Sequence, residues 1–242
     1  MITGIVVALH QELGTLTTQK IVKGQCVFLT KTLVLVYSGA GESNAEASAK
    51  LLIAQGATRL ISWGCAGALS AGLQSGDLVL ADTLITAEGE TITVNADWHQ
   101  HVKAVLEKLA CESKFALRCG VLLESKTLVS TSHDKQHKHQ QTKAIALDME
   151  SVAIAKVAQH HALPFLAIRA IADPVTMDLP KAVSHALNEQ GDVQLGKLLK
   201  YLLWHPSESK GLLILGQQFN AAKHTLKLVA KELEQLITPK TA

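Results

Sequence analysis

The sequence predicts an α/β protein with three layers, α/β/α, in which helices cover both faces of a mixed but mostly parallel central sheet. Apolar segments of strand length alternate with Ala-rich segments of helical periodicity, which is the pattern of right-handed β-α-β crossovers. Apolar residues make up 48% and aromatic residues only 4%, which favours a sheet between helices over an all-β sandwich. The length of 242 residues suits one large domain better than several small ones.

The expected elements follow one another in alternation. Residues 2–8 (ITGIVVA) form a continuous apolar run rich in β-branched residues, as expected of a strand buried on both faces. Glycine-rich turns bound several later strands, including a turn predicted at 64–67. The strands are expected at 2–8, 26–37 (a pair), 59–63, 77–84, 116–123 and 164–171, and the helices at 43–55, 98–109 and 150–161.

The C-terminal part has a different pattern, because its apolar residues recur three and four positions apart. This spacing predicts two amphipathic helices separated by Pro206, and a helical hairpin packed on the sheet is the favoured interpretation. A partner-binding or oligomerisation face and a membrane-surface anchor are the alternatives. The predicted organisation is an α/β domain at 1–190 with a helical extension at 191–242. The residues are Leu195, Leu198, Leu199, Leu202 and Leu203, then Leu212, Leu215, Phe219, Ala222, Leu226, Val229, Leu233 and Leu236.

Composition excludes some functions. The 23 Lys and Arg against 21 Asp and Glu give a net charge of +2, too weak for sequence-independent nucleic-acid binding. No apolar run reaches a membrane span and no secretory signal opens the chain, so a cytoplasmic location is expected. The four cysteines form no Cys-x-x-Cys pair and are expected to be reduced thiols.

Four polar or glycine-rich segments follow predicted strands: 10–12, 38–41, 64–67 and Asp173. In open α/β sheets, ligands bind beyond the carboxyl ends of the strands. The sequence therefore predicts a binding site at this edge.

Three carboxylates and one arginine are candidates for chemistry there. Glu12 follows a buried strand, Glu150 opens a helix whose dipole favours an ionised carboxylate, and Asp173 ends an apolar strand. Partial burial is expected to raise the pKa of Asp173, as a proton donor near neutral pH requires. Arg169, inside the same strand, needs an anionic partner, for which Glu12 is one candidate. Plainer interpretations stay open: a surface charge for Glu12, a helix-start charge or cap for Glu150 and a turn former for Asp173.

Two other sites are poorly supported. His133 and His137 have the spacing of metal ligands on a helix, but no third ligand stands at a familiar distance, and the lysines and glutamines around them favour a solvated face. Gly39-Ala40-Gly41 lacks the Lys-Ser/Thr ending of a P-loop and the third glycine of a dinucleotide fingerprint. Neither a metal nor a nucleotide cofactor is expected.

Several ordered motifs between residues 1 and about 180 resemble the nucleoside phosphorylase and nucleosidase superfamily. GIVVALHQEL is similar to the opening strand with its catalytic Glu, and SGAG at 38–41 with Asn44 is similar to the SGxGxxNA turn. WGCAGAL at 63–69 is similar to the TGSAGGL turn. ALDMESVAIAKVA followed by PFLAIRAIAD resembles the ribose- and base-binding region.

This resemblance implies a nucleoside phosphorylase-like fold and cleavage of the N-glycosidic bond of a purine nucleoside, with release of adenine. By position, Glu12 would activate water, Arg169 would orient both, and Asp173 would protonate the leaving purine. No cofactor is implied, although phosphate is a possible co-substrate. The implied substrate-binding residues, among which Glu150 holds the ribose hydroxyls, are Cys65, Ala66, Gly67, Leu128, Val129, Asp148, Met149 and Glu150.

Departures from the family pattern bear on the substrate. Cys65 and Ala172 stand where the family has serines, which affects water positioning and the hydrogen bonds around Asp173. The stretch Ile61-Ser62-Trp63 lacks the phosphate-holding Arg of hexameric bacterial phosphorylases, so phosphorolysis loses support.

Within the superfamily, the chain resembles the methylthioadenosine/S-adenosylhomocysteine nucleosidases. Compared with them, its segment from Asp82 to Trp98 is about 20 residues shorter. The shorter segment and the helical tail together resemble the hopanoid-associated phosphorylases. This resemblance implies that the substrate is a 5′-substituted adenosine such as adenosylhopane. A nucleosidase of the methylthioadenosine type and a non-catalytic nucleoside-binding protein are the alternatives. A homo-oligomer, with possible proximity to a membrane surface, is expected.

Overall fold

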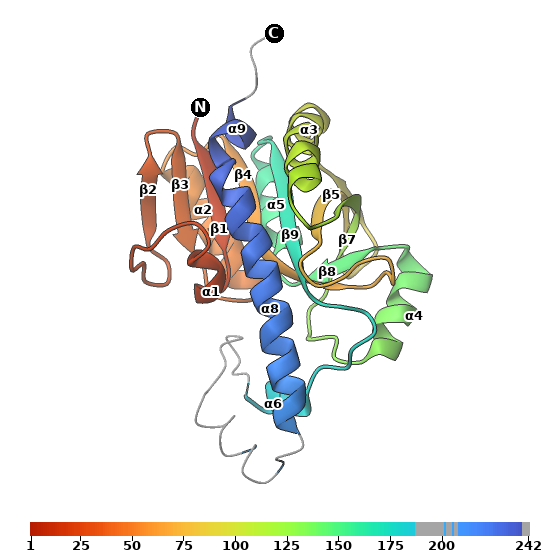
Figure 1. Ribbon diagram of the computed structural model, residues 1–242. Coiled ribbons are helices and arrows are strands. Elements are labelled where there is room, and N and C mark those ends of the chain that lie inside the picture. Colours follow the sequence, from red (N-terminus) through yellow and green to blue (C-terminus); the bar gives the residue numbers. More distant parts are fainter. Residues whose placement is uncertain (187–200, 202–204, 206–207, 239–242) are drawn as a thin grey trace.

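The computed structural model describes residues 1–186, 201, 205 and 208–238 (Figure 1). Its strands are β1 (Thr3–Val7), β2 (Cys26–Thr30), β3 (Leu33–Tyr37), β4 (Arg59–Ala68), β5 (Leu78–Ile85), β6 (Thr91–Thr93), β7 (Leu117–Glu124), β8 (Ala146–Asp148) and β9 (Phe165–Asp173). Its helices are α1 (His10–Leu13), α2 (Glu42–Ala54), α3 (Ala96–Glu112), α4 (Ser132–Thr142), α5 (Ser151–His160), α6 (Lys181–Ala186), α8 (Glu208–Lys231) and α9 (Leu233–Ile237). The predicted alternation of strands and helices is confirmed.

The described strands form one mixed sheet in the order β2-β3-β1-β4-β8-β7-β5-β6, and β9 pairs with both β4 and β5. Five pairs are parallel (β1/β3, β1/β4, β4/β9, β5/β7, β7/β8) and four are antiparallel (β2/β3, β4/β8, β5/β6, β5/β9). The mixed, mostly parallel sheet is therefore confirmed. Because β4, β8, β7, β5 and β9 pair in a closed ring, part of the sheet curls on itself, which the sequence pattern did not predict.

Helices cover both faces of the sheet and bury two apolar cores (Figure 1). On one face, α2 and α5 pack on the sheet through small and branched side chains such as Ala49, Leu52 and Ile154. On the other face, α3, α8 and α9 contribute Trp98, Leu226 and other apolar residues. This arrangement confirms the three-layer α/β/α architecture.

One predicted turn is wrong. The residues at 64–67 do not end the strand, because β4 continues to Ala68. Its neighbour β1 ends opposite Trp63, and β8 then takes the place of β1, with Gly67 opposite Leu147. A strand that exchanges one partner for another can continue through glycines that would otherwise indicate a turn.

The tail is confirmed in part. Helix α8 crosses the sheet in front of β9, and the predicted apolar stripe is buried at Ala222, Leu226 and Val229 and continues to Leu233 and Leu236 in α9 (Figure 1). The first predicted tail helix and the predicted boundary at 190/191 lie outside the described residues.

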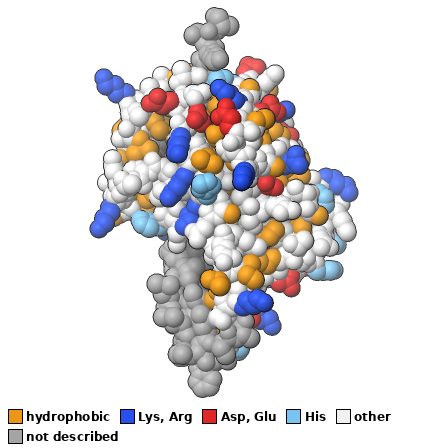
Figure 2. Space-filling model, viewed as in Figure 1, with side chains coloured by type: hydrophobic (Ala, Val, Ile, Leu, Met, Phe, Trp, Pro, Cys, Tyr) orange, Lys and Arg blue, Asp and Glu red, His pale blue; other side chains and the backbone are white. Residues whose placement is uncertain are grey.

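Exposed charged side chains of both signs lie on and next to α8. Basic and acidic side chains both occur on the face that α8 crosses (Figure 2). Lys227 and Lys231 are exposed on α8, and Glu234 is exposed on α9. Within the described ranges, no helix is long and apolar enough to cross a membrane.

Candidate active site

Glu12 lies in the short helix α1, directly after the buried strand β1. Thr15 anchors this helix, because its hydroxyl donates to the carbonyl of Glu12 at 2.6 Å and accepts from the indole Nε1 of Trp63 at 3.0 Å. Trp63 is fully buried in β4. The backbone of Glu12 is therefore fixed to the centre of the sheet.

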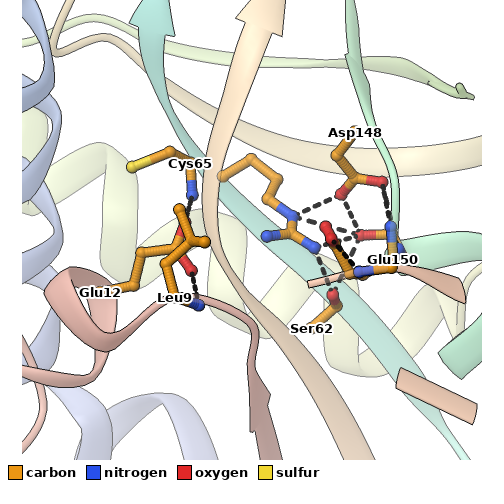
Figure 3. A network of polar contacts seen from close by, with 9 residues as sticks. Leu9, Glu12, Ser62, Cys65, Asp148 and Glu150 are labelled. Atoms are coloured by element: carbon orange, nitrogen blue, oxygen red, sulfur yellow. Dashed lines mark hydrogen bonds and ion pairs between the residues drawn. The ribbon is translucent and has the colours of Figure 1, made fainter. Parts of the chain in front are cut away.

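The carboxylate of Glu12 points into the protein, and its side of the site is drawn in Figure 3. Oε1 accepts from the backbone N–H of Cys65 at 2.7 Å, and Oε2 accepts from that of Leu9 at 3.0 Å. Glu12 is only 2% exposed, so the alternative interpretation, a surface charge, is wrong. Burial raises the pKa of Glu12 from 4.5 to about 7, against the opposing effect of Arg169. This value suits a general base near neutral pH.

Arg169 is buried and contacts Asp148 and Ser62, both of which are labelled in Figure 3. Its Nε lies 2.6 Å from Oδ2 of Asp148, and its Nη2 donates to the hydroxyls of Ser62 at 2.6 Å and Ser151 at 3.0 Å. The prediction that Arg169 needs an anionic partner is confirmed, but the partner in direct contact is Asp148. Burial lowers the pKa of Arg169, whereas the charges of Asp148, Glu150 and Glu12 raise it. Glu12 therefore acts on Arg169 as a nearby charge without a direct contact.

Glu150 precedes the first residue of α5 and links two distant segments. Its Oε1 accepts from the backbone N–H of Gly41 at 3.0 Å, which joins the start of α5 to the glycine turn before α2. Burial raises the pKa of Glu150, and Arg169 lowers it. The predicted helix-start position is confirmed, and the carboxylate is buried in the same network as Arg169.

Gly64 permits the close approach of this network to the strand. A Cβ at this position would lie 2.5 Å from Nη1 of Arg169 and 2.7 Å from Oε1 of Glu12. Both groups are buried, so neither has free space to move into. A side chain at this position would therefore displace the guanidinium of Arg169 or the carboxylate of Glu12, which approach each other at Gly64.

Asp173 stands at the end of β9, opposite Gly67 of β4. Its Oδ1 lies 2.7 Å from the ammonium of Lys135 in α4, and its Oδ2 lies 3.5 Å from where a Cβ of Gly67 would be. The expected rise in pKa is confirmed in direction, because burial raises the pKa of Asp173 while Lys135 opposes it.

The remaining predicted substrate residues differ in their surroundings. Cys65 and Ala66 continue β4 between the two glycines, and burial, followed by the charge of Glu12, raises the pKa of the Cys65 thiol well above its usual value. Val129 is buried, whereas Leu128 is 40% exposed, in the loop between β7 and α4. Met149 is half-buried beside Glu150. Their contact with a substrate stays a prediction.

Asp148 also stays a predicted substrate ligand, although its carboxylate already has several partners in the protein. Besides Arg169, Oδ1 accepts from the backbone N–H groups of Glu150 at 3.3 Å and Ser151 at 3.1 Å, and Oδ2 accepts from the hydroxyl of Ser151. These contacts hold the start of α5 against β9.

Sequence reasoning missed three polar residues of the site: Ser62, Ser151 and Lys135. Ser62 is a polar residue inside an apolar strand, which was an available signal for a buried hydrogen-bond partner. Lys135 belongs to the stretch for which a solvated face was favoured. That interpretation holds for His133, whose side chain is 91% exposed, but it is wrong for Lys135, which is 1% exposed.

A metal site at His133 and His137 is not formed. Their rings stack with centroids 6.5 Å apart on α4, and the described part of the chain contains no group of three or more His, Cys, Asp or Glu side chains placed to hold a metal ion.

Comparison with known proteins identifies the family. The sequence profile of the phosphorylase superfamily matches residues 3–205. The chain belongs to the phosphorylase superfamily. This superfamily member is an enzyme, and the family resemblance seen in the sequence motifs is confirmed.

Curated relatives of this superfamily member are nucleosidases. It is 28% identical over 209 residues to the 5′-methylthioadenosine/S-adenosylhomocysteine nucleosidase of Baumannia cicadellinicola, covering 76% of this chain and 89% of the relative. It is 27% identical over 202 residues to the enzyme of that name from Staphylococcus epidermidis, covering 76% of this chain and 82% of the relative.

Solved structures share the superfamily fold. The nucleosidase of Neisseria meningitidis in complex with methylthio-immucillin-A aligns with a TM-score of 0.71 at 18% identity, covering 96% of this chain and 98% of that chain. Futalosine hydrolase of Helicobacter pylori aligns with a TM-score of 0.66 at 18% identity, covering 97% and 96%. At this identity the likeness shows the fold.

Proposed function

We propose that this superfamily member cleaves the N-glycosidic bond of a purine nucleoside by hydrolysis and releases adenine. The observation that carries the proposal is the placement of two carboxylates with raised pKa, the buried Glu12 and the partly buried Asp173, at Gly64 and Gly67 of the same strand. The two glycines are three positions apart on β4, so their Cα atoms lie roughly 10 Å apart. The nucleosidase names of the relatives support this reaction.

In the proposed reaction, Glu12 accepts a proton from the attacking water, which adds to the anomeric carbon of the ribose. With its pKa near 7, Glu12 is ionised in a large fraction of molecules at neutral pH and still holds the proton that it receives. Arg169 lies close enough to orient Glu12 and the water while Asp148 fixes its guanidinium.

Cleavage of the bond builds positive charge on the sugar and negative charge on the purine. In the proposed reaction, Glu150, whose carboxylate is buried, holds the ribose hydroxyls and stabilises the positive charge. Asp173, whose pKa is raised, gives a proton to the purine ring as the bond breaks. The side chains of the protein supply the acid and the base, so no cofactor is required, and phosphate stays a possible co-substrate.

The connection between β5 and α3 bears on the 5′ substituent of the substrate. The β5 and β6 strands form a short hairpin through residues 86–90, and α3 begins at Ala96, so this connection is compact. Together with the partly exposed Leu128, it favours room for a large apolar group, such as that of adenosylhopane. Methylthioadenosine is the alternative substrate. A homo-oligomer, a cytoplasmic location and proximity to a membrane surface stay predictions.

The test is chromatographic detection of adenine from adenosine, methylthioadenosine and a long-chain 5′-alkyl adenosine, each with and without phosphate. We expect adenine and free ribose product without phosphate, and about a 1,000-fold lower kcat in Glu12→Gln. Ribose 1-phosphate formed only with phosphate would establish phosphorolysis instead. Adenine binding without turnover of any of these substrates would refute the proposed reaction.

A further inference from the structure

Lys135 has an unusual environment for a lysine in a polar helix. Its neighbours on α4 are mostly partly or fully exposed, yet Lys135 is 1% exposed. A buried ammonium needs partners for all three of its N–H groups. Lys135 has three: Oδ1 of Asp173 at 2.7 Å, the carbonyl of Met177 at 2.8 Å and that of Pro174 at 3.2 Å. This set of acceptors fits a charged ammonium.

These contacts join α4 to the loop after β9. Two further hydrogen bonds make the same connection, from the backbone N–H of Ser132 to Asp178 at 2.6 Å and from that of Leu179 to the carbonyl of Ser130 at 2.7 Å. Thr131 also caps the start of α4 by accepting from the N–H of Asp134 at 3.1 Å. The position of the ammonium is therefore fixed from both segments.

The two oxygens of Asp173 have different surroundings as a result. Oδ1 is held by Lys135, whereas Oδ2 lies beside Gly67 at the end of β4. We propose that Lys135 is a positioning residue for proton donation, which holds Oδ1 of Asp173 so that Oδ2 faces the departing purine. This inference rests on the proposed function, and it adds to it a residue that acts through Asp173 without touching the substrate.

The charge of Lys135 acts on Asp173 against the effect of burial. Asp173 faces the ammonium of Lys135 from α4 and the carboxylate of Asp178 from the loop after β9. Burial and Asp178 raise the pKa of Asp173, whereas the nearby ammonium favours the ionised carboxylate and limits that rise. The role that we assign to Lys135 is therefore the orientation of the carboxyl group.

The first experiment compares two leaving groups in Lys135→Met. Adenine needs a proton to leave, whereas 4-nitrophenolate leaves from 4-nitrophenyl riboside without one. We expect kcat for adenosine to fall about 100-fold and kcat for 4-nitrophenyl riboside to fall less than about threefold. Lys138→Met, which removes the same charge from a partly exposed position of α4, should change neither by more than about threefold. Equal losses on both substrates in Lys135→Met would overturn the inference.

A double variant tests whether Lys135 acts through Asp173. If it does, Lys135→Met combined with Asp173→Asn should match Asp173→Asn alone on adenosine within about threefold. This variant also relieves the buried, unpaired carboxylate that Lys135→Met leaves behind, so it covers the case in which the single variant folds poorly. A double variant much slower than Asp173→Asn would overturn the inference.

A titration that needs no turnover separates this inference from the proposed function. The carboxyl carbon signal of Asp173 in ¹³C NMR should show a pKa about one to three pH units higher in Lys135→Met than in the wild type. A wild type that releases neither adenine nor nitrophenol would refute the proposed function, and with it the role of Lys135 in proton donation. An unchanged titration in an active enzyme would refute only the inference.

Discussion

The site has two sides, each with a carboxylate near a buried cation, and the cation has different partners on each side. On the Glu12 side, Arg169 pairs directly with Asp148 and two serines, while Glu12 accepts from two backbone N–H groups. On the Asp173 side, Lys135 binds the carboxylate itself at 2.7 Å. The cation near Glu12 is thus largely neutralised by another acid, whereas the cation near Asp173 acts on it directly.

In the proposed reaction, this difference allows one site to contain both a base and an acid. Burial raises the pKa of both carboxylates, so burial alone does not separate their roles. The local partner does: backbone amides hold Glu12 in a fixed orientation, and an ammonium holds one oxygen of Asp173 and leaves the other toward Gly67. Three predictions test this comparison through the free energy of unfolding.

The largest effect is expected from Arg169→Met, which removes the cation of the Glu12 side. Asp148 is almost fully buried, and without Arg169 its charge has no direct counter-ion. We expect a loss of about 3 to 5 kcal/mol in the free energy of unfolding, measured by urea denaturation. Lys50→Met, which breaks an exposed ion pair with Glu46, is the control and should cost less than about 1 kcal/mol. Similar losses in both would contradict the central role of Arg169.

A slightly smaller effect is expected from the titration of Glu12. Its pKa in the folded protein lies above its ordinary value, so ionisation destabilises the fold: the penalty is absent below pH 4.5 and complete above about pH 7. The difference corresponds to about 3 kcal/mol. Relative to the wild type, Glu12→Gln should therefore gain stability as the pH rises from 4.5 to 8.

Urea denaturation at several pH values measures this gain. In the active enzyme, kcat should also rise with pH through about 7, because the base has to be ionised. Parallel stability curves for the wild type and Glu12→Gln across this range would show that Glu12 titrates normally.

The fold and most of the Glu12 side could be predicted from the sequence, since Glu12, Arg169 and Glu150 adjoin long apolar segments whose periodicity is clear. The ion pair with Asp148 could not, because β8 has only three residues and shows no period. Lys135 could not either. Its helix has the composition of a solvated surface, and its burial arises only from the packing of the loop after β9.

The smallest effect, and the most direct comparison of the two sides, comes from two glycines of β4. A Cβ at Gly64 would meet Arg169 and Glu12 at 2.5 and 2.7 Å, whereas a Cβ at Gly67 would meet Oδ2 of Asp173 at 3.5 Å, an ordinary contact. Gly64→Ala should therefore cost about 1 to 3 kcal/mol in urea denaturation, and Gly67→Ala less than about 1 kcal/mol. If Gly67→Ala lowered the free energy of unfolding more than Gly64→Ala, the Asp173 side would be the more tightly packed one. There would then be no space beside Oδ2 for the departing purine.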